Sequence, residues 1–162
     1  DTHVFPLEHL MKMYHGSVGR NSTLILGLTP DDRGLIPDVD VARLKEFGNE
    51  IQRRFGSPIV SVQGEGKRLQ LKLPATKKIN AIVIAEDIRQ GERVRNYKVE
   101  GKVNGKWKIL ATGSCIGHKR IEEIEPVEVS ALRLQIEESL AQPVIADFQS
   151  MRINTKDKFG NI

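Results

Sequence analysis

Apolar residues recur with a helical period in two segments near the start of the chain, residues 7–16 and about 37–55. Such spacing places the apolar side chains on one side of a helix, so each segment is expected to be an amphipathic helix. Pro6 comes directly before the first segment and Gly16 ends it, as the residue preferences at helix ends favour. The positions that carry the period are Leu7, Leu10, Met11 and Tyr14 in the first segment and Val41, Leu44, Phe47, Ile51 and Phe55 in the second.

Between the two expected helices lies a short run of consecutive apolar residues, residues 24–28. Consecutive apolar side chains point to both faces of a strand, which predicts a strand buried on both sides, as in the middle of a parallel sheet. A strand of this kind needs neighbours along its edges. The first part of the chain is therefore expected to be an α-β-α fragment of a larger structure.

Beyond residue 57 the pattern changes to a period of two, which is typical of strands with one buried face. Asn104 and Gly105 separate two such stretches, and this pair favours a two-residue hairpin turn because both positions tolerate positive φ. About eight short strands with turn residues between them predict a β-sandwich or jelly roll, so the chain is expected to be mainly β. The stretches with the clearest pattern are residues 69–73, 79–84, 97–103, 108–111, 121–124, 132–136 and 144–153.

The two patterns meet at Gly56, where glycine and proline punctuate the chain. We place a domain boundary there, with residues 1–56 and 57–162 on its two sides. Residues 1–56 hold 7 basic and 8 acidic side chains, so the formal net charge of +4 comes from the second part. An excess of this size suits an anionic partner but is also common on ordinary domains.

The composition excludes several classes of protein. No apolar run approaches the roughly 18–20 residues that a membrane-spanning helix needs, so no membrane span is expected. One cysteine, Cys115, excludes an internal disulfide, and the four histidines lack metal-ligand spacing, so we expect no metal site and no cofactor. Aromatic residues make up 5% of the chain and no nucleic-acid-recognition motif is present, so no nucleic-acid partner is expected.

Residues 17–37, SVGRNSTLILGLTPDDRGLIP, followed by VARLKEFG at 41–48, resemble the last βα unit of α-L-fucosidases of glycoside hydrolase family 29. In that family this unit closes a (β/α)8-like catalytic barrel, and a β-sandwich follows. Residues 86–94, 97–107 and 116–121 look like the discoidin-like sandwich (coagulation-factor C-type, galactose-binding-domain-like) appended to many bacterial fucosidases. The two resemblances cover nearly the whole chain in the right order.

The resemblance implies the C-terminal portion of a retaining α-L-fucosidase that hydrolyses terminal α-linked L-fucose from glycans. The family's nucleophile and acid/base carboxylates lie on upstream strands without a counterpart here, so no catalytic residue is assigned and the fragment alone is expected to be inactive. A barrel needs about 250 residues, so upstream catalytic-domain residues are an expected partner, beside fucosylated glycans. The chain starts at Asp1 with no initiator Met or signal peptide, and we expect it to be cut from a longer, exported protein of extracellular or periplasmic location. Alternatives are an autonomous carbohydrate-binding module or a purely structural accessory sandwich.

Asp31 and Arg33 are the first candidate binding residues. They follow the expected strand at residues 24–28, and in a barrel the loops after the strands line the active-site face. Asp31 and Asp32 are adjacent, so they cannot face each other across a sugar, and turn chemistry is the favoured interpretation of both.

The second set of candidates lies in the expected loops of the sandwich, where folds of this kind bind ligands. It consists of Arg89, Arg93, His118 and Arg120. The favoured alternative is that these side chains are solvated or pair with one another. Trp107 could stack on a sugar ring, but we expect it to point inward and pack in the core, and Cys115 has no base nearby in sequence that would make it a catalytic thiol.

Overall fold

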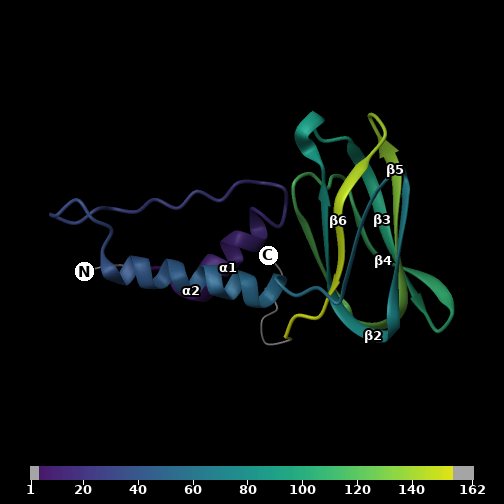
Figure 1. Ribbon diagram of the computed structural model, residues 1–162, viewed down its shortest axis with the longest axis horizontal. Helices are drawn as coiled ribbons and strands as arrows, with labels where there is room; N and C mark the ends of the chain where they lie inside the picture. Colours follow the sequence, from purple (N-terminus) through teal and green to yellow (C-terminus); the bar gives the residue numbers. More distant parts are fainter. Residues whose placement is uncertain (1–3, 155–162) are drawn as a thin grey trace.

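The computed structural model describes residues 4–154 of the chain, which form two helices followed by six strands (Figure 1). The helices are α1 (Leu7–Gly16) and α2 (Asp38–Phe55), so both expected helices are confirmed. The strands are β1 (Val60–Glu65), β2 (Arg68–Glu86), β3 (Val94–Val103), β4 (Lys106–Gly113), β5 (Arg120–Ser139) and β6 (Val144–Met151). One turn of 3-10 helix, η1 (Ile88–Gln90), lies between β2 and β3.

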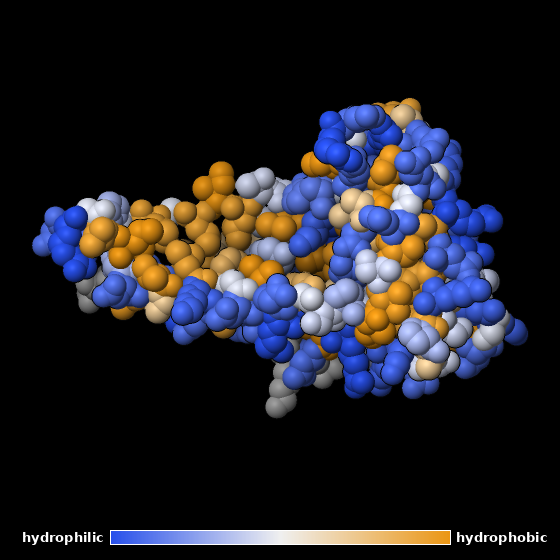
Figure 2. Space-filling model, viewed as in Figure 1, coloured by the Kyte–Doolittle hydropathy of each residue, from blue (hydrophilic) through white to orange (hydrophobic). Residues whose placement is uncertain are grey.

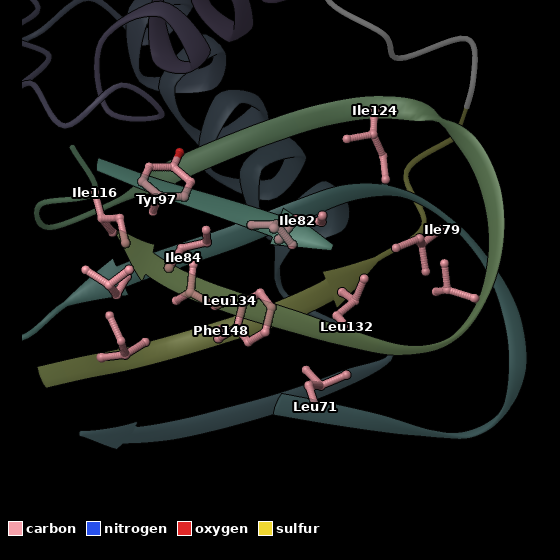
Figure 3. Packing of buried hydrophobic residues seen from close by; sticks show 14 of the residues in the cluster. Leu71, Ile79, Ile82, Ile84, Tyr97, Ile116, Ile124, Leu132, Leu134 and Phe148 are labelled. Atoms are coloured by element: carbon pink, nitrogen blue, oxygen red, sulfur yellow. The ribbon is translucent and has the colours of Figure 1, made fainter. Parts of the chain in front are cut away.

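The strands form one antiparallel sheet in the order β1-β6-β2-β5-β3-β4, which folds over on itself to make two layers. β2 and β5 bend together, and the ladder between them breaks between Lys72 and Lys77 (Figure 3). The first half of β2 and the second half of β5 form one layer with β3 and β4. The second half of β2 lies between β5 and β6 in the other layer, with β1 at its edge.

The predicted β-sandwich is therefore confirmed, with six strands in place of about eight. The stretches 69–73 and 79–84 are two halves of β2, and 121–124 and 132–136 are two halves of β5, because these strands bend where loops were expected. The hairpin at Asn104 and Gly105 is confirmed by their positive φ of 49° and 79°. β1 was not expected from the sequence.

The core between the two layers is apolar and fully enclosed (Figure 3). Its largest buried side chains include Tyr97, Phe148, Ile82, Ile84, Leu132 and Leu134. They come from four strands and both layers, which places the period-two positions of the sequence on the inner faces. Burial of these side chains is the main source of stability for the sandwich.

The second half of β2 is buried on both faces. Ile82 and Ile84 point into the sandwich core, whereas Ala81 and Val83 belong to a second apolar cluster beneath the helices. The other buried members of that cluster are Leu10, Met11, Tyr14, Phe47, Ile121, Met151 and Ile153. Residues on both sides of residue 56 thus share one core, and the helices form a third layer on the sandwich.

Polar side chains reinforce this junction at two places. The buried Arg54 of α2 donates to Glu50 of the same helix (Nε to Oε1, 2.7 Å) and to Glu8 of α1 (Nη2 to Oε1, 3.0 Å). Asn80 of β2 is also buried, and its amide exchanges two hydrogen bonds of 2.7 Å with the backbone N–H and C=O of Ile153. In both places these hydrogen bonds satisfy polar atoms that would otherwise be buried without partners.

The expected strand at residues 24–28 is wrong. Residues 22–30 form no strand, and Ile25 is 86% exposed although the sequence predicts burial on both faces. A strand is stabilised by hydrogen bonds to its neighbours, and none of the described strands pairs with this segment. The α-β-α fragment is therefore two helices joined by an extended segment.

The core assignment predicts the cost of truncating one buried side chain. Replacing Leu134, which is completely buried, with alanine should lower the free energy of unfolding by about 2–5 kcal/mol, because contacts and apolar burial are both lost. Urea unfolding followed by circular dichroism measures this loss. Leu140→Ala, at a leucine that is 72% exposed, is the control and should change stability by less than about 0.5 kcal/mol. Equal losses in the two variants would contradict the assignment.

Candidate functional site

The loop after residue 28 holds the first pair of candidate residues. Asp31 accepts hydrogen bonds at Oδ1 from the backbone N–H groups of Arg33 (2.9 Å) and Leu35 (3.1 Å), and at Oδ2 from the Arg33 guanidinium (2.6 Å). The Arg33 side chain, followed by the backbone donor of Leu35, lowers the pKa of Asp31. The structure thus brings Asp31 and Arg33 together in one exposed turn, as the favoured interpretation of turn chemistry describes.

The same part of the chain exposes an unusual number of large apolar side chains. The apolar strip, as we call it, consists of Phe5, Ile25, Leu28, Leu35, Ile36, Val39 and Val41. It covers much of the extended segment and helices in the view of Figure 2. A cavity of about 240 Å³ opens beside it, between α1, α2 and residues 25–28. Contiguous exposed apolar surface of this kind marks an interaction site.

Arg89 and Arg93 lie at one end of the sandwich, between β2 and β3. The Arg89 guanidinium pairs with Asp87 (Nη2 to Oδ2, 2.5 Å), which lowers the pKa of Asp87 to about 2 and raises that of Arg89. Arg93 donates to the Gln142 carbonyl (2.7 Å) and to the side chain of Gln90. Both arginines line a polar groove of about 510 Å³ with Glu65, Asp87, Gln90 and Val144.

A buried carboxylate fixes the loops at this end of the sandwich. Glu86 is 4% exposed, and its Oε1 accepts from the backbone N–H groups of Arg93 (3.0 Å) and Val94 (3.1 Å). Its Oε2 accepts from the N–H of Gly117 (3.0 Å). Three backbone donors from two loops therefore converge on one side chain, which the sequence analysis missed. The signal that could have found it is a carboxylate within two residues of the buried run at residues 79–84.

His118 belongs to a contact between the sandwich and the segment after α1. Asn21 has a positive φ of 64°. Its Oδ1 accepts a hydrogen bond from the His118 backbone N–H (2.8 Å) and lies 3.0 Å from Nδ1 of the His118 ring. The Asn21 amide also donates to Glu92 (2.9 Å). His118 is therefore positioned by the chain itself.

Arg120 belongs to a polar cluster around Glu122, which lies opposite Ile82 of the sandwich core in the register of β2 and β5. It donates to Glu122 (Nε to Oε1, 2.8 Å), a carboxylate that also accepts from the Tyr97 hydroxyl (2.6 Å) and lies 3.4 Å from Arg20. Burial, with the charge of Glu122 beside it, raises the pKa of Tyr97. His15 is buried in the same region; burial and the nearby Arg20 lower its pKa to about 4.

The candidates fall into separate groups. Asp31 and Arg33 share a turn, and Arg89 and Arg93 share a groove, whereas His118 and Arg120 belong to two other hydrogen-bonded clusters. Within residues 4–154, no group of His, Cys, Asp or Glu side chains could hold a metal ion. No helix in that range is long and apolar enough to cross a membrane.

The expected inward position of Trp107 is wrong. Trp107 pairs with Lys102 across the β3-β4 hairpin and lies outside the sandwich core, with the Arg133 guanidinium 4.3 Å from its ring centroid. Residues opposite each other in an antiparallel pair share a face, and Lys102 alternates with the core residues Val99 and Val103. The register of the two-residue turn therefore carries Trp107 to the outer face.

Comparison with known proteins gives one consistent result. No family model matches the chain. A solved structure from Bacteroides thetaiotaomicron, assigned as an α-L-fucosidase, is 53% identical to it and has a TM-score of 0.89 over 93% of the chain. The chain resembles α-L-fucosidases over most of its length. It spans about a third of its relatives, covering 34% of the Bacteroides protein and 35% of α-L-fucosidase 1 of Arabidopsis thaliana, which is 25% identical over 87% of the chain.

A third relative belongs to glycoside hydrolase family 29. This member of that family from an unknown rumen bacterium is 27% identical, with a TM-score of 0.79 over 98% of the chain and 32% of its own length. The resemblance to α-L-fucosidases of glycoside hydrolase family 29 noted in the sequence is thereby confirmed.

The role of Glu86 can be tested by removing its charge. Glu86→Gln should lower the free energy of unfolding by about 1–3 kcal/mol. Only the oxygen of the glutamine amide can accept hydrogen bonds, so at least one of the three backbone donors would lose its partner. Glu128→Gln makes the same change at an exposed carboxylate of β5 and should be nearly neutral. Urea unfolding of both variants at pH 7 provides the comparison. A neutral Glu86→Gln would show that Glu86 does not hold the loops.

The buried His15 predicts how stability depends on pH. Its pKa is lowered from 6.5 to about 4 in the folded state, so the unfolded chain binds the proton more readily between these values. Stability should therefore fall by roughly 1–2 kcal/mol as the pH drops from 7 to 5. Unfolding midpoints measured across this range test the prediction. His15→Gln should flatten the slope, and His118→Gln should leave it in place; the reverse result would contradict it.

Proposed function

We propose that this chain is the C-terminal portion of a retaining α-L-fucosidase that removes terminal α-linked L-fucose from glycans. The observation that carries the proposal is the identity of 53% to the Bacteroides relative over 93% of the chain, at a TM-score of 0.89. Because the chain spans about a third of that relative, we assign the catalytic carboxylates to the remaining two thirds. Retaining hydrolysis needs two carboxyl groups about 5 Å apart across the sugar, and Asp31 is already engaged by Arg33.

We further propose that residues 1–56 complete the catalytic domain and that residues 57–162 form an accessory sandwich. The apolar strip supports this division. Ile25 and Leu28 are exposed in this chain, and neighbouring strands of a barrel would cover them. The occupant of the strip is then the preceding part of the same polypeptide. The shared cluster around Val83, Met11 and Phe47 favours a sandwich that braces the catalytic domain.

The location of the candidates agrees with this arrangement. Asp31 and Arg33 lie in the loop after residues 24–28, where they would stand at the rim of the fucose site once the barrel is closed. Arg89 and Arg93 line the polar groove at one end of the sandwich, and this groove is the candidate site for contact with a longer glycan. An enzyme acting on glycans outside the cell would be exported, and we propose an extracellular or periplasmic location.

A chimera tests the proposal. The matching third of the Bacteroides relative is replaced by this chain, and hydrolysis of 4-nitrophenyl α-L-fucoside is measured for the parent, the chimera and the isolated chain. We expect the chimera to keep at least roughly a tenth of the parent kcat/KM, and the isolated chain to show no turnover.

Two variants of the chimera examine the apolar strip. Ile25→Asp should abolish activity, because an unpaired carboxylate would be buried against the preceding strands. Leu140→Asp makes the same kind of change at an exposed leucine of the sandwich and should be tolerated. Turnover by the isolated chain, or an inactive chimera that is folded and monomeric, would refute the assignment.

A further inference from the structure

The outer face of the layer formed by β4, β3, β5 and the first half of β2 carries the only tryptophan of the chain. We call this surface the tryptophan face and define it by Trp107, Ile109, Lys102, Glu100, Arg133 and Gln135. The helices cover the other layer of the sandwich, so they leave this face uncovered. None of the functions discussed so far uses it.

The centre of the tryptophan face combines a stacked ring with exposed apolar surface. The Arg133 guanidinium lies over the indole of Trp107, with its carbon 4.3 Å from the ring centroid. Ile109 stands two residues further along β4 on the same face and is 61% exposed. A buried role explains neither side chain, whereas an indole beside an aliphatic side chain matches the apolar face of a pyranose ring.

Planar polar groups beside the ring are held in fixed positions. Glu100 accepts from Arg133 (Nη2 to Oε2, 2.7 Å) and from the Gln135 amide (2.5 Å), and Glu100 is paired with Ile109 across the strands. These hydrogen bonds limit the rotamers of three side chains that can still reach a ligand with their remaining donors and acceptors. Such pre-organisation lowers the entropic cost of binding.

The charge of the tryptophan face is unbalanced toward the positive. Its one carboxylate, Glu100, is already engaged by Arg133, and Glu137 further along β5 is engaged by Lys98 (2.9 Å). Across residues 4–154, no ion pair involves the neighbouring cations Lys102, Lys72 or Arg68. Lys102 lies directly opposite Trp107, and Lys72 lies on the same layer in β2. A ligand that complements this face therefore carries negative charge.

We propose that the tryptophan face binds an anionic glycan, with a pyranose ring against Trp107 and Ile109 and a sulfate or carboxylate group at Lys102. Such binding would hold the enzyme on acidic polysaccharide. Binding of single-stranded nucleic acid uses several aromatic side chains in succession, and here one ring stands alone. A sugar chain needs one such ring together with hydrogen-bonding groups at its edges, and these are present.

Because Trp107 is the only tryptophan, its fluorescence reports directly on this face. The 162-residue chain is titrated with a heparin-derived octasaccharide, a hyaluronan octasaccharide and maltooctaose, which offer sulfate plus carboxylate, carboxylate alone, and no charge. We expect a saturable spectral change with at least one anionic sugar and at least tenfold weaker binding of maltooctaose. Comparison of the two anionic sugars tells sulfate from carboxylate recognition.

Variants separate a built site from general attraction to a basic protein. Lys102→Gln should weaken binding about three- to tenfold, whereas Lys45→Gln, which removes the same charge from an exposed position of α2, should not. Trp107→Ala, followed by calorimetry with its thermal unfolding recorded, should weaken binding about tenfold. If that variant does not fold, Ile109→Ala takes its place with an expected loss of about threefold.

Several results would overturn the proposal. They are the absence of any spectral change, equal effects of Lys102→Gln and Lys45→Gln, and equally tight binding of an oligothymidylate of matched charge. A spectral change that follows protein concentration without sugar would assign the face to self-association instead. The aryl-fucoside assay of the chimera does not involve this face, so failure of either proposal leaves the other standing.

Discussion

The fold depends on one stretch of sheet, the second half of β2, that is buried on both faces. Ile82 and Ile84 pack in the sandwich core, while Ala81 and Val83 form the surface against which α1 and α2 pack. The two helices meet through the Arg54–Glu8 ion pair and through the ring of Tyr14, which contacts Phe47 and Phe55, and this surface of β2 holds the pair of helices on the sheet. A polar side chain at either helix-facing position would separate the helical layer from the sheet without opening the sandwich.

Two buried carboxylates fix the positions of groups around the apolar clusters. Glu86 accepts hydrogen bonds from the backbone of Arg93, Val94 and Gly117, and Glu122 accepts hydrogen bonds from the side chains of Tyr97 and Arg120. A carboxylate in such a position is tolerated only when its oxygens are satisfied, so each one fixes the geometry of the groups around it. The loops at the polar groove are consequently rigid elements of the scaffold, and ligand contact there would require little reorganisation.

Much of this arrangement could be predicted from the sequence because hydrophobic periodicity is a local property. Both helices and the inward positions of Leu132 and Leu134 follow from spacing alone.

The predictions that failed depend on contacts between distant parts of the chain. The extended segment at residues 24–28 has the composition of a buried strand, but a strand exists only beside partners. Trp107 was misplaced because its direction depends on the register across the hairpin, and its pairing with Lys102 would have settled it. Glu86 and Glu122 were missed because each has one partner far away along the chain, Gly117 for Glu86 and Tyr97 for Glu122.

The continuity of β2 and β5 through both layers also shapes how the protein reaches its structure. Their pairing joins Arg68 to Gln135, and β1 finds its partner only in β6, so the sandwich consists mainly of contacts between distant parts of the sequence. During synthesis the β3-β4 hairpin can form early, whereas the remaining strands must wait until almost the whole chain has emerged. Folding is therefore expected to be slow and late, with β1 and the apolar strip exposed in the nascent chain, and this is the interval in which premature association is most favourable.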